Sequence, residues 1–141
     1  MNITGVAASA KLDGNKIVVS LSLKSKVARQ YKFNVLVLED NIYSYQYNAS
    51  ESWMHYHNNA IRESYADIVY TDITGADWGF VNNESTTHKV VEIPFTDNRV
   101  VKTNCKVLVI IAAKNAAYED KFEVVNTALC GLDQSTTFEY R

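Results

Sequence analysis

The residues best able to do chemistry lie close together, in the segment from 38 to 62. His55 and His57 are two positions apart, so on an extended backbone both side chains lie on one face and could supply two zinc ligands. His88 or Asp40 could complete such a site, but the spacing dictates neither of them. We therefore expect no metal, and a metal-assisted hydrolase that uses His55 and His57 stays the alternative.

Arg62 is the second candidate in this segment. A planar guanidinium pairs with a carboxylate, and Glu39 or Asp40, where the preceding strand should end, is its natural partner. One interpretation is structural, because such a pair would fix the segment around Arg62 to the rest of the fold. The other is functional: Arg62 would recognise an anion or a glycan together with Asn58 and Gln46.

A row of tyrosines follows the same strand. Tyr43, Tyr45 and Tyr47 alternate along the chain, which places three phenol rings on one face of an extended segment. Such a row could stack against sugar rings or receive a peptide, or it could cover the rim of the fold and dock a neighbouring domain. The candidate binding residues are therefore Tyr43, Tyr45, Gln46, Tyr47, His57, Asn58 and Arg62, and the structural ones are Glu39, Asp40 and Arg62.

Motifs of known catalytic chemistry are missing from the sequence. It contains no Gly-x-Ser-x-Gly, no phosphate-binding glycine loop and no His-Glu-x-x-His. The carboxylates between 63 and 84 are about five residues apart, which is too far for a calcium loop. We expect a protein that is not an enzyme and that needs no cofactor.

The elements that position these residues read as strands. Alternating or continuous apolar patterns predict strands at Lys16–Leu23, Gln30–Leu38, His88–Phe95, Cys105–Ala113 and Phe122–Leu129. A weaker strand at Ile3–Lys11, and a last short strand or tail in the polar residues Gly131–Arg141, bring the number of expected strands to about seven. The spacing of the turns is typical of an immunoglobulin-like antiparallel β-sandwich, an all-β fold.

The middle of the chain differs from this pattern. Asn58 or Asn59 could cap a short helix over residues 60–66, and residues 67–84 look irregular. Nine aromatic residues lie between Tyr43 and Phe80. We therefore expect an insert at about 41–85 that contains one short helix, is rich in aromatic side chains, and caps the sandwich or presents a binding face.

Composition limits the class of protein. With 141 residues, 47% hydrophobic and 21% charged, the chain fits one globular domain spanning residues 1–141. A net charge of −2 and scattered Lys and Arg residues favour no nucleic-acid partner. No signal peptide follows Met1, which fits either a cytoplasmic protein or an excised domain, and the strand pattern that starts at Ile3 favours the excised domain.

The two cysteines are open to two interpretations. A hairpin centred near residue 117 or 118 would place Cys105 directly opposite Cys130. Opposed β-carbons lie about 4.5–5.5 Å apart, which allows a disulfide only at the closer, non-hydrogen-bonded positions. Otherwise both are buried thiols that act as small hydrophobic side chains.

The segment from 38 to 62 also carries a family resemblance. Glu39-Asp40-Asn41-Ile42 leads to Gln46, and a block from Tyr56 to Arg62 follows it. This pattern resembles the C-terminal domain of the Omp-twenty-eight-related outer-membrane lipoproteins. The matching residues are Val35 to Asp40, Ile42, Gln46, His57, Asn58, Asn59, Ile61 and Arg62, and the motif-bearing part covers about a third of the chain.

The resemblance implies a non-catalytic binding module, excised from a bacterial lipoprotein of the outer membrane or cell surface. It implies a preceding thioredoxin-like domain as one partner, and a surface protein or polysaccharide as another. Membrane attachment would come only from a lipid anchor outside this chain. The Cys-x-x-Cys motif of a thioredoxin-like domain is absent from these residues, so no redox role is carried over. A purely structural spacer remains a further alternative.

Overall fold

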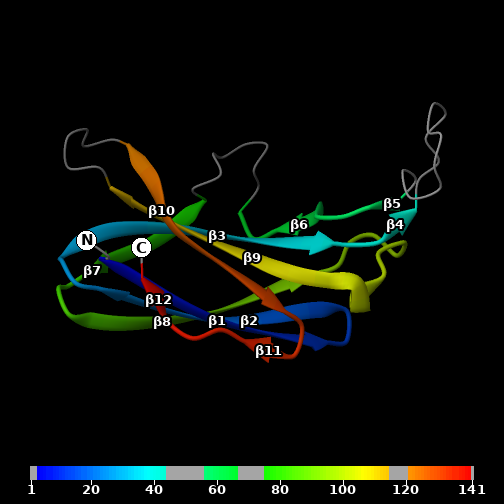
Figure 1. Ribbon diagram of the computed structural model, residues 1–141, viewed down its shortest axis with the longest axis horizontal. Helices are drawn as coiled ribbons and strands as arrows, with labels where there is room; N and C mark the ends of the chain where they lie inside the picture. The colour runs from blue at the N-terminus through cyan, green and yellow to red at the C-terminus, as the bar shows by residue number, and fades with distance from the viewer. Residues whose placement is uncertain (1–2, 44–55, 67–74, 115–120, 141) are drawn as a thin grey trace.

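The computed structural model describes residues 3–43, 56–66, 75–114 and 121–140, which form two antiparallel sheets packed face to face (Figure 1). Among these residues, sheet A consists of β1 (Thr4–Asp13), β2 (Lys16–Ser25), β8 (Ser85–Pro94), β11 (Gln134–Ser135) and β12 (Glu139–Tyr140). The order is β11–β1–β2–β8, and β12 also pairs with β1. Pro94 is the last residue of an edge strand, as its sequence position indicates.

Sheet B carries the candidate residues. In the described part of the chain it consists of β10 (Phe122–Gly131), β9 (Cys105–Lys114), β3 (Arg29–Glu39), β6 (Ala60–Ser64) and β7 (Ala76–Val81). Both β6 and β7 pair with β3, which is long enough to take them one after the other along the same edge. A small ladder of β4 (Ile42–Tyr43) and β5 (Tyr56–His57) continues beyond the end of β3.

The core between the sheets follows from the alternation of each strand. The inward side chains of β2 are Ile17, Val19, Leu21 and Leu23, and those of β3 include Tyr31, Phe33, Val35 and Val37. All eight are at most 2% exposed. The all-β sandwich expected from the sequence is confirmed. No helix in the described ranges is long and apolar enough to cross a membrane.

The expected helix over residues 60–66 is wrong, because the chain forms strand β6 there. Asn59 has a left-handed backbone (φ 60°) instead of the extended conformation of a helix cap, and its N–H donates to Asp40. Two turns of isolated helix are only marginally stable. Pairing with β3 instead satisfies the backbone of Ala60–Ser64 and covers an open sheet edge.

The expectation that residues 67–84 are irregular is also wrong in part, because β7 lies within them. In the structure Gly79 has φ 122° where the pairing of β7 with β3 shifts register, which is how a bulge is accommodated. Trp78 is buried, meets Phe33 edge-on at 5.3 Å, and donates from Nε1 to Thr87 Oγ1 at 2.8 Å.

Cys105 and Cys130 are not opposite one another. Cys130 pairs with Val107: next to the turn Val124 pairs with Ala112, a register that would place Cys130 opposite Lys106, and the bulge at Val125 shifts the register by one more residue. Both cysteines are free and buried. Of the two interpretations, the structure therefore has the pair of buried thiols.

Candidate functional site

The ion pair expected of Arg62 is present, with Glu39 as its partner. Arg62 Nε donates to Glu39 Oε1 at 3.0 Å, and the second carboxylate oxygen accepts the N–H of Val101 at 3.1 Å. The side chain of Glu39 is 3% exposed and that of Arg62 is 29% exposed. A buried carboxylate is costly unless both of its oxygens are engaged, and here both are. The pair joins two strands, whereas the sequence had suggested a helical cap.

Asp40 holds the next part of the same end. Its Oδ2 lies 2.9 Å from Lys106 Nζ on β9, and its Oδ1 accepts the N–H of Asn59 at 2.9 Å. The hydrogen bond from Lys106 and the one from the Asn59 N–H hold the pKa of Asp40 below its usual value of 3.8. Asn58 Oδ1 accepts the N–H of Asn41 at 3.0 Å. These contacts tie the chain just before β6 to the chain just after β3.

β6 is also tied to the other sheet. Glu63 Oε1 accepts two hydrogen bonds from Thr96, one from its N–H at 2.8 Å and one from its hydroxyl at 2.6 Å. Thr96 follows the end of β8 in sheet A. Glu39, Asp40, Arg62 and Glu63, which we call the β6 clamp, therefore connect β6 to β3, to β9 and to the end of β8.

The β4–β5 ladder brings the backbones of two candidate binding residues, Tyr43 and His57, onto neighbouring strands. In the β4–β5 ladder Ile42 is opposite His57 and Tyr43 is opposite Tyr56. Tyr45, Gln46, Tyr47 and His55 lie outside the described residues. The expected row of tyrosines and the expected His55–His57 pair therefore stay predictions.

Each charged side chain of the β6 clamp already has a hydrogen-bond or ion-pair partner in the fold. Among the described residues no group of His, Cys, Asp and Glu side chains could hold a metal ion. Asp40, a ligand considered from the sequence, is held by Lys106. His88, the other one, lies in sheet A, where its Nδ1 is 2.7 Å from the hydroxyl of Ser22. What the described clamp does chemically is to hold strands in register.

Cys105 lies beside the clamp but is not poised for chemistry. Burial, and after it the charge of Glu39, raises the pKa of the Cys105 thiol to about 11. Burial also raises the pKa of Cys130 above 9.0. A thiol in that range is protonated at neutral pH and is a poor nucleophile.

The outer face of sheet B is unexpectedly apolar. Leu36, Leu38 and Ile110 form a buried cluster there, with Leu108 packed against them. The same sheet carries four exposed apolar side chains: Ile61 (50% exposed), Val124 (48%) and Leu129 (54%), and, toward the start of β3, Phe80 (59%). Their strand partners are Leu38, Gln30, Ala112 and Leu108, which point away from the core, so all four lie on the outer face.

The outer face of sheet A has the opposite character. The outward residues of β2 are Lys16, Val18, Ser20, Ser22 and Lys24, and β8 adds Thr86, His88 and Glu92 beside them. Val90 is the large exposed apolar residue of β8. An antiparallel sheet in a sandwich commonly has one solvated face, and sheet A follows this rule whereas sheet B does not.

One sign of the outer face of sheet B is visible in the sequence, since Leu36 and Leu38 interrupt the alternation of their strand and predict burial on both sides. Ile61 and Phe80 could not be found in this way, because the sequence predicted a helix around Ile61 and an irregular segment around Phe80, where the structure has β6 and β7. Ile61 and Phe80 are therefore assigned to this face only by the pairing of β6 and β7 with β3.

Comparison with known proteins supports the fold. No protein-family model matches the chain, and no curated protein matches it either. Among solved structures it is similar to the crystal structure of Spo0M, a sporulation control protein from Bacillus subtilis, with a TM-score of 0.50 and 10% sequence identity. The match covers 93% of this chain and 50% of that one, so the chain spans half the length of its structural neighbour. At this identity the likeness shows the fold alone.

Proposed function

We propose that this chain is a non-catalytic interaction module of a bacterial outer-membrane or cell-surface lipoprotein, and that it docks an adjoining domain of its own polypeptide. The observation that carries the proposal is the outer face of sheet B. Exposed apolar side chains gathered on one face mark interaction sites more often than scattered ones do. Here Ile61, Phe80, Val124 and Leu129 share that face, and Val90 stands on the other sheet.

The β6 clamp supports the proposal, because it gives the docking face a fixed shape. Ile61 is next to Arg62 in β6, so the hydrogen bond from Arg62 to Glu39 also fixes the position of Ile61. An interface gains affinity when its residues are already ordered before binding. The clamp and the exposed apolar side chains therefore belong to one arrangement.

The compartment and the partner rest on the resemblance carried by Glu39 to Arg62. A thioredoxin-like domain that precedes this module is the partner which that resemblance implies. We include Tyr43, Tyr45 and Tyr47, with Gln46, His57 and Asn58, as a second part of the proposed binding surface, because the tyrosines alternate along the sequence.

The test is a binding titration between this chain and the remainder of its own encoded polypeptide, produced as a separate protein. Leu129→Lys places a charge on the docking face, and Val90→Lys places the same charge on the outer face of sheet A, where Val90 is 66% exposed. We expect Leu129→Lys to weaken association at least about tenfold and Val90→Lys to leave it unchanged.

Three results would contradict the proposal. The first is that this chain does not associate with the remainder of the polypeptide. The second is that the two lysine variants bind equally well. The third is that the encoded polypeptide holds no further domain. Circular dichroism and melting temperature control for folding, since both positions are exposed and should tolerate lysine. Metabolic labelling of the native gene product with palmitate tests the lipoprotein part separately.

A further inference from the structure

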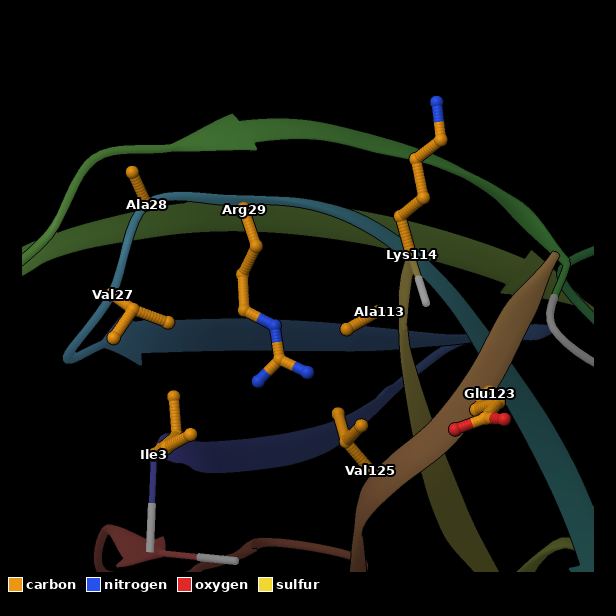
Figure 2. A pocket seen from close by; sticks show the side chains of 8 residues that line it. All are labelled: Ile3, Val27, Ala28, Arg29, Ala113, Lys114, Glu123 and Val125. Atoms are coloured by element: carbon orange, nitrogen blue, oxygen red, sulfur yellow. The ribbon is translucent and has the colours of Figure 1, made fainter. Parts of the chain in front are cut away.

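A cavity of about 330 Å³ opens at the end of the sandwich, away from the β6 clamp. Ile3, Val27, Ala113 and Val125 supply apolar walls, and Arg29, the first residue of β3, supplies a charge (Figure 2). This volume is at the lower end of the range of about 300–1,000 Å³ typical of small-molecule sites. An apolar cleft with one well-placed charged group is the usual form of such a site.

Arg29 is directed into the cavity. Figure 2 shows its guanidinium between Ile3, Ala113 and Val125. Its contacts are a long hydrogen bond of 3.5 Å from Nη1 to Thr4 Oγ1 and a cation–π approach of 5.6 Å to the ring of Tyr31. No carboxylate in the described part of the chain pairs with it. A guanidinium has five N–H donors, so most of those of Arg29 have no acceptor among the residues that the structure describes.

A buried chain of hydroxyl groups fixes Arg29 from behind. The Val27 carbonyl can only accept, so the hydroxyl of Ser25 donates to it and accepts from Tyr31, 2.7 Å away. The hydroxyl of Tyr31 then accepts from Thr4, at 2.8 Å, which leaves a lone pair of Thr4 for Arg29. Each hydroxyl proton of the chain is used once, and in this order the guanidinium donates to Thr4 at one end while the Val27 carbonyl accepts at the other. Because Thr4, Ser25 and Tyr31 are fully buried, they hold this position rigidly.

The charge of the lining favours an anion. Lys114 and Glu123 at the rim carry opposite formal charges, so Arg29 leaves the lining net positive. Figure 2 shows the Lys114 side chain extending away from the cavity, which leaves Arg29 as the cation inside it. We propose that this cavity binds a small carboxylate with an apolar body, whose carboxylate pairs with Arg29 and whose body lies against Ile3, Val27 and Val125. This site is independent of the outer face of sheet B.

The experiment is an NMR titration of the ¹⁵N-labelled chain with isocaproate, with isocaproamide and with inorganic phosphate. Isocaproamide keeps the apolar body and removes the charge, and phosphate keeps the charge and removes the apolar body. We expect isocaproate to bind at millimolar concentration or better and to shift the amides of Val27, Ala28, Ala113 and Val125. The amide and phosphate should each bind at least about tenfold more weakly.

A variant pair locates the charge. Arg29→Met removes the guanidinium and keeps a long apolar side chain, and it should weaken isocaproate binding at least about tenfold. Arg99→Met is the matched control, because Arg99 is exposed and pairs with Asp97 far from the cavity. If Arg29→Met does not fold, the three ligands on the unaltered chain still decide the matter. Shifts elsewhere, equal responses to isocaproate and its amide, or no shifts at all would overturn the proposal.

Discussion

Replacing Arg62 with methionine should destabilise the protein by about 3 kcal/mol, because it leaves the carboxylate of Glu39 buried without its cation. Removing one partner of a buried ion pair costs about 3–5 kcal/mol. We take the lower end, since the side chain of Arg62 is 29% exposed and water can partly replace it, whereas that of Glu39 is 3% exposed. For a domain of this size the loss corresponds to a melting temperature lower by about 10 °C.

Urea unfolding measures this effect, and two further variants give it meaning. Lys16→Met breaks the exposed pair of Lys16 with Glu92, whose side chains are 37% and 57% exposed, so it should destabilise the protein far less than Arg62→Met does. The double variant Glu39→Met/Arg62→Met removes both charges and should be more stable than Arg62→Met alone. If Arg62→Met is no worse than Lys16→Met, or if the double variant is the least stable of the three, the reasoning about the β6 clamp is wrong.

Three further predictions concern pH and backbone. The pKa of Cys105 is raised from 9.0 to about 11, so the stability that its protonated thiol contributes is present below pH 9 and is lost as pH rises toward 11. Cys105→Ala should therefore reduce the fall in the free energy of unfolding at alkaline pH, measured by urea unfolding. The pKa of Asp40 is lowered from 3.8, so the stability that its carboxylate contributes is present above that pH and is lost as pH falls through the lowered value. Lys106→Met should reduce this loss of stability in acid. An unchanged dependence of the free energy of unfolding on acidic pH would contradict the prediction. A Cβ at Gly75 (φ 80°) would clash with the backbone oxygen of Phe33, whereas one at Gly14 (φ 59°) would meet open space. Gly75→Ala should therefore lower the melting temperature more than Gly14→Ala.

The regular strands could be predicted because local pattern and tertiary environment agree in them. Lys16–Leu23 alternates and corresponds to β2 (Lys16–Ser25), and Cys105–Ala113 is continuously apolar and corresponds to β9 (Cys105–Lys114). Each buries a face that its own sequence makes apolar. Period and burial therefore indicate the same element.

β6 could not be predicted, because its pattern is set by its partner. Ala60–Ser64 has no alternation of its own, and the open edge of β3 and the clamp decide its conformation. The partner of Arg62 could be narrowed to Glu39 or Asp40, because these two carboxylates end the preceding strand. The structure has Glu39. The register of Cys130 depends on a bulge in β10, which no local signal announced.

Arg29 shows the same limit for a site. In the sequence it is one basic residue before a strand. Its significance comes from Thr4 and from Val125, which lie far away along the chain and reach it only through the packing of the two sheets.

Hydroxyl-radical footprinting of the full encoded polypeptide tests the central claim most directly. In this chain alone, Ile61, Phe80, Leu129 and Val90 should all be oxidised, each at a rate that also depends on its side chain, since all four are at least 50% exposed. In the full polypeptide, the account predicts that Ile61, Phe80 and Leu129 become protected while Val90 stays reactive. If the oxidation of Ile61, Phe80 and Leu129 is the same in the full polypeptide as in this chain alone, the proposal that the outer face of sheet B is a docking surface is contradicted.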